Sequence, residues 1–229
     1  MANRRIPLAY LASGQGRLVE SSVLALRALP VAPVPVLLAT DRPGCPAVDR
    51  ARRLGLDIWT DPEGSPGTPG WEDRLGAELR ARGVGIVVLA GFLRVLRHGL
   101  LKTYAGRILN VHPSLLPRHR GQGMYGHHVH EAVLRSQDRE TGATVHLVTE
   151  DLDAGPILAQ ARVPVFPTDT PETLAERLRP VETQLLVTVL REIQEGRRPW
   201  PEGSGRRLGE GGRTGDTPPS SFNEVRPGA

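Results

Sequence analysis

The sequence predicts an α/β fold, with a Rossmann-like, mainly parallel twisted sheet flanked by helices. Short runs rich in Val, Ile and Leu alternate with stretches of helical periodicity, and this alternation is typical of parallel strands joined by helices. The run at 86–90 also lacks alternating polar residues, as expected for a strand that is covered on both faces of the sheet.

The expected elements follow one another in a regular order along the chain. Apolar runs predict strands at 6–12 (IPLAYLA), 34–39 (VPVLLA), 86–90 (IVVLA), 107–112 (RILNVH), 143–149 (ATVHLVT) and 157–165 (ILAQARVPV). Helical periodicity predicts helices at 17–29, 45–54, 71–82, 124–136 and 171–196.

One folded domain over residues 1–200 and a disordered tail over 201–229 are expected. From Pro201 onward the chain consists of Gly, Pro, Ser, Arg and Glu with almost no apolar residues. Such a segment cannot bury enough surface to offset the entropy of ordering it. Inside the domain, DPEGSPGTPG at 61–70 predicts a turn-rich loop.

Composition argues against several classes of protein. The net charge is +4, Lys102 is the only lysine, and no run of Arg is interleaved with aromatic residues, so no nucleic-acid partner is expected. Cys45 is the only cysteine, which excludes an intramolecular disulfide and a cysteine-built metal site. No stretch approaches the roughly 20 apolar residues of a membrane span. The first apolar run stops at Ser13, so it reads as a strand and not as a signal peptide, and a cytoplasmic protein is expected.

A glycine-rich turn joins the first expected strand to the first helix. The glycines of ASGQGRL at 12–18 allow the backbone to approach a ligand, and a helix N-terminus offers free N–H groups to an anion. Gly14 and Gly16 begin a dinucleotide fingerprint, but Val19 occupies the third glycine position, which argues against a pyrophosphate cofactor. A single phosphate, with Arg17 beside it, is the better prediction; a plain tight turn is the alternative.

Polar side chains mark the end of the strand in ILNVHPSLLP at 108–117. The strand period of two places Asn110 and His112 on one face, and Pro113 cannot continue the ladder. Ligands of open parallel sheets bind outside the carboxyl ends of the strands. The pair therefore predicts a site, although a strand end with a satisfied polar pair is the alternative.

Two carboxylates in TEDLDAGPILAQ at 149–160 complete this pattern. Asp151 and Asp153 precede Gly155-Pro156, a tight turn that can aim a carboxylate into a crevice. An Asp near His112 favours the charged imidazole, which raises its pKa, and can relay protons. Turn chemistry is the alternative, but it explains one Asp more easily than two.

Together these motifs resemble a known family. SGQG, AGFLRVL, NVHPSLLP and LDAGPI, in this order and at these separations, are similar to the formyltransferases that use 10-formyltetrahydrofolate, over roughly residues 6–200. The sequence is most similar to the branch that formylates the amine of glycinamide ribonucleotide, the third step of purine synthesis. The resemblance implies a one-carbon transferase with a folate co-substrate, small-molecule substrates, no metal, and a monomer or homodimer.

The resemblance also implies roles for individual residues. The family's catalytic residues fall on Asn110, His112 and Asp153. Its first folate loop, which holds the pterin through backbone contacts, matches Leu93, Arg94, Val95 and Leu96, and its second matches Thr149, Glu150, Asp151, Leu152 and Asp153, with Asn110 also on the folate side. The ribonucleotide site falls on Gly14, Gly16, Arg17, Leu18 and Glu182.

Three positions depart from the family pattern. Arg17-Leu18 stands where the family usually has Ser-Asn, and Glu182-Thr183 where it usually has Glu-His. The family's Arg before the third helix has no match in GTPGWED at 67–73. Phosphate binding is still expected, because backbone N–H groups do not depend on the side chain.

The expected reaction proceeds through a tetrahedral intermediate. The amine of the ribonucleotide attacks the formyl carbon, and the amide of Asn110 and a protonated His112 stabilise the resulting oxyanion. Asp153 is expected to keep His112 charged and to help move the proton of the amine toward the departing N10 of the folate.

Other functions fit the sequence less well. A methionyl-tRNA formyltransferase is expected to have a second folded domain at its C-terminus, where this sequence has the predicted tail. A formyltetrahydrofolate hydrolase is expected to have a regulatory domain ahead of the first strand, which here begins near residue 6. A nucleotide-binding module or nicotinamide oxidoreductase could use Asp41, at the end of the second strand, toward a ribose. The broken fingerprint and the Asn-His-Asp set count against it.

The segment HHVH invites a metal hypothesis. On a helix, His127, His128 and His130 converge less well than the i, i+4 pair of zinc enzymes, and Glu131 is the only flanking carboxylate at ligand spacing. Solvated or packing histidines are the better prediction. His146, in the middle of an expected strand, is predicted to be a structural core or crevice-wall histidine.

Overall fold

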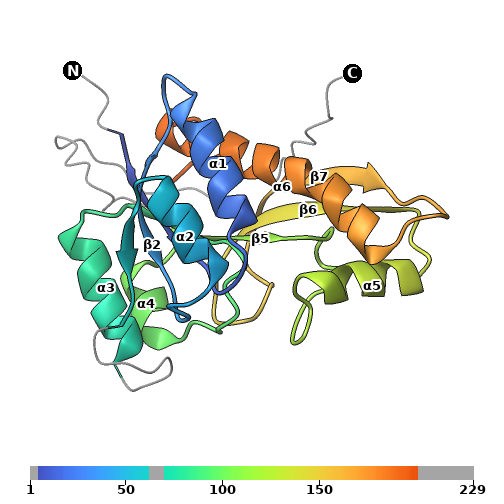
Figure 1. Ribbon diagram of the computed structural model, residues 1–229, viewed down its shortest axis with the longest axis horizontal. Coiled ribbons are helices and arrows are strands. Elements are labelled where there is room, and N and C mark those ends of the chain that lie inside the picture. The colour runs from blue at the N-terminus through green and yellow to red at the C-terminus, as the bar shows by residue number, and fades with distance from the viewer. Residues whose placement is uncertain (1–4, 62–69, 201–229) are drawn as a thin grey trace, which may run out of the picture.

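A seven-stranded sheet forms the centre of the protein, seen in a computed structural model that describes residues 5–61 and 70–200 (Figure 1). The strands are β1 (Pro7–Leu11), β2 (Val34–Ala39), β3 (Asp57–Trp59), β4 (Ile86–Leu89), β5 (Ile108–His112), β6 (Glu140–Leu147) and β7 (Ile157–Pro164). The helices are α1 (Arg17–Arg27), α2 (Pro46–Arg53), α3 (Trp71–Ala81), α4 (His98–Thr103), α5 (His127–Arg135) and α6 (Pro171–Gln194). The predicted tail at 201–229 and most of the predicted loop at 61–70 lie outside the described residues.

The strand order β3-β2-β1-β4-β5-β6-β7 confirms the mainly parallel, Rossmann-like sheet. Neighbouring strands from β3 to β5 are parallel, whereas β6 pairs antiparallel with β5 and β7. From β1 the chain moves outward to β2 and β3, and it then returns to β4 on the other side of β1. A topological switch point therefore lies between β1 and β4, and ligands bind there in open α/β sheets.

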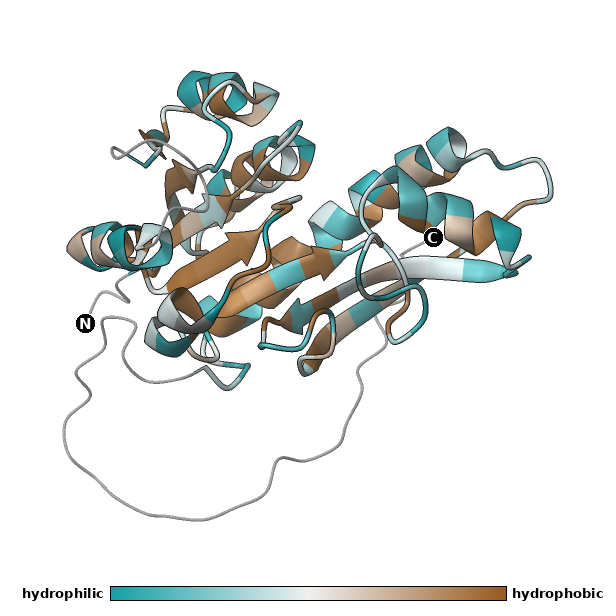
Figure 2. Cartoon of the chain, turned by 90° about the horizontal axis from the view of Figure 1, so that it is seen from below, coloured by the Kyte–Doolittle hydropathy of each residue, from teal (hydrophilic) through white to brown (hydrophobic). Residues whose placement is uncertain are grey.

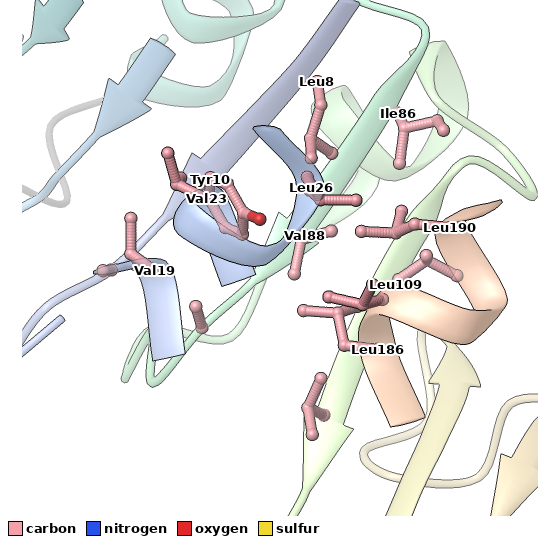
Figure 3. Packing of buried hydrophobic residues seen from close by; sticks show 14 of the residues in the cluster. Leu8, Tyr10, Val19, Val23, Leu26, Ile86, Val88, Leu109, Leu186 and Leu190 are labelled. Atoms are coloured by element: carbon pink, nitrogen blue, oxygen red, sulfur yellow. The ribbon is translucent and has the colours of Figure 1, made fainter. Parts of the chain in front are cut away.

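Alternate side chains of β1 belong to the hydrophobic cores on the two faces of the sheet. Leu8 and Tyr10 face the helices α1, α2 and α6 and are fully buried among them; Figure 3 shows both packed beside Val23 and Leu26 of α1. Ala9 and Leu11 point to the other face, where α3 and α4 cover the sheet. The central strands are accordingly hydrophobic, while the helices carry hydrophilic residues on the outside (Figure 2). Burial on both faces explains the unbroken apolar runs.

Two elements were not predicted from the sequence. Strand β3 has only three residues and includes an exposed Asp57 at the sheet edge, too little for a periodic signal. Helix α4 has six residues, and the carboxylate of Glu72 in α3 accepts hydrogen bonds from the backbone N–H groups of Arg97 (2.7 Å) and Leu100 (3.1 Å) at its start. This cap comes from a distant part of the chain, so the local sequence does not reveal it.

Several predicted boundaries also differ from the structure. The helix expected from residue 124 begins at His127, because Gly126 has a backbone conformation that is not helical (φ 52°, ψ −125°). The strand expected from residue 143 begins at Glu140, where it pairs with Pro164 of β7. In the part of the chain that the structure describes, no helix has the length and hydrophobicity needed to cross a membrane.

Candidate active site

A cavity of roughly 590 Å³ opens at the carboxyl ends of β1, β4 and β5. Its walls are the turn after β1, the loop after β4, the end of β5, the glycine-rich segment 121–126, His146 of β6, the loop 148–153 and one residue of α6. All of the predicted site residues line it: Gly14, Gly16, Arg17, Leu18, Leu93, Arg94, Val95, Leu96, Asn110, His112, Thr149, Glu150, Asp151, Leu152, Asp153 and Glu182. The fold therefore brings together five segments that are far apart in the sequence.

Asp153 lies at the centre of the polar residues in this cavity. Its Oδ2 is 3.8 Å from Nδ1 of His112 and accepts a hydrogen bond from the backbone N–H of Gly121 (3.2 Å). Its Oδ1 is 3.5 Å from Nδ2 of Asn110 and 3.6 Å from Nε2 of His146. The side chain is nearly buried, and the residue has a left-handed backbone conformation (φ 52°), which is uncommon for a non-glycine residue. The loop thus holds this carboxylate in one defined place.

The protonation state of His112 differs from the prediction. Its Nε2 lies 2.8 Å from the carbonyl oxygen of His119, and because a carbonyl only accepts, Nε2 carries the hydrogen and Nδ1 faces Asp153. Burial lowers the pKa of His112, and the opposing effect of Asp153 is smaller. Asp153 acts in the predicted direction, but the prediction that it keeps His112 charged in the ligand-free protein is wrong: the neutral imidazole predominates near pH 7.

His146 orients the amide of Asn110. The two residues are directly opposite in the β5–β6 register, and Nδ2 of Asn110 lies 3.1 Å from Nε2 of His146. Nδ1 of His146 donates to the carbonyl of Leu147 (2.9 Å), so Nε2 is the nitrogen that accepts from Asn110. Burial lowers the pKa of His146, which favours this neutral form. The crevice-wall prediction for His146 is confirmed, but its contact with Asn110 was not predicted.

The turn after β1 is held rigidly against α2. Gly16 has a left-handed conformation (φ 68°), and a Cβ on it would lie 2.6 Å from Cβ of Ala47. The backbone carbonyls of Gly14 and Gln15 accept hydrogen bonds from Ala47 N–H (3.0 Å) and from Nε of Arg50 (2.9 Å). The start of α1 is thereby fixed beside the cavity, where its first N–H groups suit an anion.

Apolar side chains stand at the mouth of the cavity. Leu93, Val95 and Leu152 are 41, 53 and 44% exposed, although they belong to the loops that line it. The loop after β4 is supported from behind by Trp71, whose ring stacks on Phe92 at 5.9 Å and lies 5.4 Å from the guanidinium carbon of Arg94. Exposed apolar groups around a cavity favour an organic ligand with an apolar part.

Glu182 lines the cavity from α6, on the same side as the turn after β1. Its side chain is half-buried. Burial raises the pKa of this carboxyl to about 7, against a smaller opposing effect of Arg179. A carboxyl that titrates near neutral pH inside a cavity is typical of a binding or catalytic site.

The histidines of HHVH do not form a metal site in the structure. His127 and His128 contact the carboxylate of Glu131 (3.2 and 3.4 Å), and His127 also lies 3.7 Å from Glu172. His130 is buried in α5, and burial lowers its pKa to about 4. Over residues 5–61 and 70–200, no group of three or more His, Cys, Asp and Glu residues is arranged to hold a metal ion.

The polar residues suit chemistry in which negative charge develops on an oxygen. An amide donor, an imidazole that can be protonated and a carboxylate converge within one nearly buried cluster, while a helix N-terminus and a second carboxyl line the other side of the cavity. Sequence reasoning found the three central residues. It missed the contact of His146 with Asn110 and that of His112 with the carbonyl of His119, because neither the cross-strand register nor the path of the loop after β5 can be deduced from local patterns.

Comparisons with known proteins agree with this arrangement. A family model described as formyl transferase matches residues 7–190. The chain is 41% identical over 169 residues to the chloroplastic phosphoribosylglycinamide formyltransferase of Arabidopsis thaliana, covering 73% of this chain and 58% of that protein. It is 31% identical over 191 residues to the phosphoribosylglycinamide formyltransferase of Escherichia coli K12, covering 83% and 88%.

Solved structures show the same fold. Glycinamide ribonucleotide transformylase 1 from Symbiobacterium toebii matches with a TM-score of 0.78 and 33% identity, covering 86% of this chain and 91% of that chain. Phosphoribosylglycinamide formyltransferase from Bacillus halodurans matches with a TM-score of 0.75, also at 33% identity, covering 84% and 97%. This chain thus spans 88 to 97% of the three bacterial proteins named above but less than two thirds of the Arabidopsis protein.

Proposed function

The chain belongs to the formyl transferase family, and we propose that it transfers a formyl group from 10-formyltetrahydrofolate to the amine of glycinamide ribonucleotide. The products are formylglycinamide ribonucleotide and tetrahydrofolate. The observation that carries this proposal is the convergence of Asn110, His112 and Asp153 on a cavity that the glycine turn after β1 also lines. The reaction would be a step of purine synthesis.

In the proposed complex the two substrates enter from different sides. The phosphate of the ribonucleotide meets the start of α1, with Arg17 exposed beside it, and its ribose hydroxyls meet Glu182. The folate lies between the loop 93–96 and the loop 149–153, whose exposed apolar side chains cover its flat ring. The formyl group, attached to N10, then reaches the cluster around Asp153.

The chemistry follows from the proton and charge balance of formyl transfer. The amine nitrogen attacks the formyl carbon, and the electron pair of the C=O bond moves onto oxygen. Nδ2 of Asn110 lies 3.5 Å from Oδ1 of Asp153, which is the outer limit of a hydrogen bond. This N–H can therefore donate to a closer oxyanion instead. The negative oxygen favours protonation of His112. Asp153 accepts the proton of the amine and passes it, directly or through water, to N10 as the C–N10 bond breaks.

The direct test of this proposal is an assay of whether turnover of 10-formyltetrahydrofolate requires glycinamide ribonucleotide as the formyl acceptor. The protein is mixed with 10-formyltetrahydrofolate, with and without glycinamide ribonucleotide, and the absorbance change of the folate is followed. Turnover only in the presence of the ribonucleotide is the expected result. Turnover without it would indicate a hydrolase, and no turnover in either mixture would contradict formyl transfer to this acceptor. The His112→Ala protein controls for reaction without the catalytic cluster.

Ribonucleotide binding is expected to weaken as the pH falls through neutrality. An ionised Glu182 accepts hydrogen bonds from ribose hydroxyls better than a protonated one, and its pKa of about 7 places the change near physiological pH. The KM for the ribonucleotide should therefore rise as the pH is lowered from about 8 to about 6. The Glu182→Gln protein should show a higher KM and a flatter pH profile. Parallel profiles for the two proteins would contradict this role, because the titration of the substrate itself is common to both.

Further properties stay predictions. The protein is expected to act on small molecules in the cytoplasm, as a monomer or a homodimer, without a bound metal. The plant relatives carry the word chloroplastic in their names, so the compartment of this protein is best tested by locating it in the cell.

A further inference from the structure

A buried hydroxyl–carboxylate pair lies directly behind the loop 93–96. The hydroxyl of Ser13, at the end of β1, donates to Oδ1 of Asp41 at 2.6 Å. The same hydroxyl oxygen accepts a hydrogen bond from the backbone N–H of Leu93 at 2.9 Å. Ser13 is 2% exposed and Asp41 is 6% exposed. Neither residue lines the cavity, and the proposed mechanism uses neither.

The carboxylate of Asp41 determines that the Ser13 hydroxyl is an acceptor toward Leu93. A serine hydroxyl has one hydrogen to donate and two lone pairs to accept with. Because Asp41 takes the hydrogen, a lone pair of Ser13 stays directed at the N–H of Leu93. This inward orientation also removes Asp41 as a ribose ligand of a dinucleotide, the role considered for it from the sequence. The carboxylate points to a neighbouring strand end, not to solvent.

The hydrogen bond between Leu93 N–H and Ser13 is important for the loop 93–96 because few other contacts hold the backbone of this loop. At its two ends, Ser13 N–H donates to the carbonyl of Gly91 (3.1 Å) and Arg97 N–H donates to Glu72 (2.7 Å). Between these ends, Leu93 is the residue of 93–96 whose N–H donates to an acceptor within the described part of the chain. Arg94 and the adjoining Phe92 are supported by Trp71, but through their side chains. The course of the backbone at Leu93 therefore depends on Ser13.

We propose that Asp41 is a positioning residue for the folate substrate, acting through the hydroxyl of Ser13 on the backbone of the loop 93–96. This inference rests on the proposed function, in which that loop holds the folate. The hydrogen bonds of Ser13 with Asp41 and Leu93 join the ends of β1, β2 and β4 at the switch point. The shape of the folate site therefore depends on a residue that does not touch the folate. On the ribonucleotide side, the turn after β1 has its own anchors on α2, where Ala47 N–H and Nε of Arg50 donate to the carbonyls of Gly14 and Gln15, so the loss of Asp41 is expected to affect that side less.

The test separates the two substrates. In Asp41→Ala the Ser13 hydroxyl is free to rotate, and the KM for 10-formyltetrahydrofolate is expected to rise about three- to tenfold, the loss that one hydrogen bond typically causes. The KM for the ribonucleotide should stay within about twofold. Asp41→Asn should restore the folate KM, because the amide oxygen can accept the same hydrogen bond. Ser13→Ala should reproduce the loss. An unchanged folate KM in Asp41→Ala, an equal rise of both KM values, or a failure of Asn to restore the folate KM would overturn the proposal.

Thr40→Val is the matched control for a purely structural effect. Thr40 is the buried neighbour of Asp41 in the same strand end, and its hydroxyl contacts Arg42 and Cys45, not the loop. This variant should lower the melting temperature without separating the two KM values. Equilibrium binding of tetrahydrofolate, followed by tryptophan fluorescence, needs no turnover. If the wild type binds tetrahydrofolate but does not formylate the ribonucleotide, the proposed function fails, while the comparison of Asp41→Ala with Asp41→Asn still decides the role of Asp41.

Discussion

Replacing Asp153 by asparagine is expected to lower kcat by about 100- to 1000-fold, the usual loss when a catalytic proton carrier or a charge-stabilising group is removed. The amide has nearly the same size and can still accept the hydrogen bond from Gly121 N–H. Asparagine also tolerates the left-handed backbone of this position. The substitution therefore removes the negative charge and the ability to accept a proton while the loop keeps its shape.

His112→Ala is expected to cause a loss of similar size. The imidazole is buried at the end of β5 and faces Asp153 across 3.8 Å, so its removal deprives the oxyanion of the charge that offsets it. If the two residues act as one unit, the double variant should be about as slow as either single variant, because effects within a catalytic unit are not additive.

Steady-state kcat and the melting temperature should be measured together for both variants. Asp49→Asn is a suitable control, since this carboxylate lies exposed on α2 in an ion pair with Arg52. The control should retain wild-type kcat. Near-normal turnover in both Asp153→Asn and His112→Ala would contradict the mechanism, whatever their stability.

The second large effect is expected from Gly155→Ala, a change of one methyl group. A Cβ at this position would lie 1.9 Å from the backbone oxygen of Leu147, far closer than two such atoms can approach. The loop between β6 and β7 must move to accommodate it, and this loop carries Asp153. Because a misplacement of about 1 Å can cost about 100-fold in rate, kcat/KM should fall by about that factor.

Gly44→Ala provides the matched control for this substitution. No atom lies within 4 Å of a Cβ built on Gly44, and its backbone is not left-handed. This variant should keep wild-type activity and stability. Gly155→Ala with unchanged kcat/KM would show that the position of the Asp153 loop is not critical, which would weaken the assignment of Asp153 as a proton carrier.

Much of the fold was predictable because its strands are buried on both faces. Runs such as 86–90 are unbroken stretches of apolar residues, which can be recognised in the sequence without knowledge of distant contacts. The alternation of strands and helices then predicts the fold class. Strand β3 and helix α4 escaped detection for the opposite reason: they are short, and α4 is capped by Glu72 from another helix. Elements that depend on distant contacts cannot be predicted from local periodicity.

The residues of the candidate site could be predicted from the sequence, but the direction of the pKa shift of His112 could not. Strand period two placed Asn110 and His112 together, and Gly155-Pro156 indicated a loop that aims Asp153. The pKa of His112 could not be judged, because burial, which no local pattern reveals, outweighs the neighbouring carboxylate. The contact of His146 with Asn110 depends on the β5–β6 register, and the role of Ser13 depends on three strand ends meeting at one point.

The fate of the formyl carbon tests the central claim most directly. The protein is incubated with 10-formyltetrahydrofolate labelled with ¹³C in the formyl group and with glycinamide ribonucleotide, and the products are analysed by mass spectrometry. Formyl transfer predicts that the label appears on the ribonucleotide in an amount equal to the tetrahydrofolate formed, and that Asp153→Asn slows both together. Label released as free formate, or a ribonucleotide that stays unlabelled while tetrahydrofolate accumulates, would contradict it.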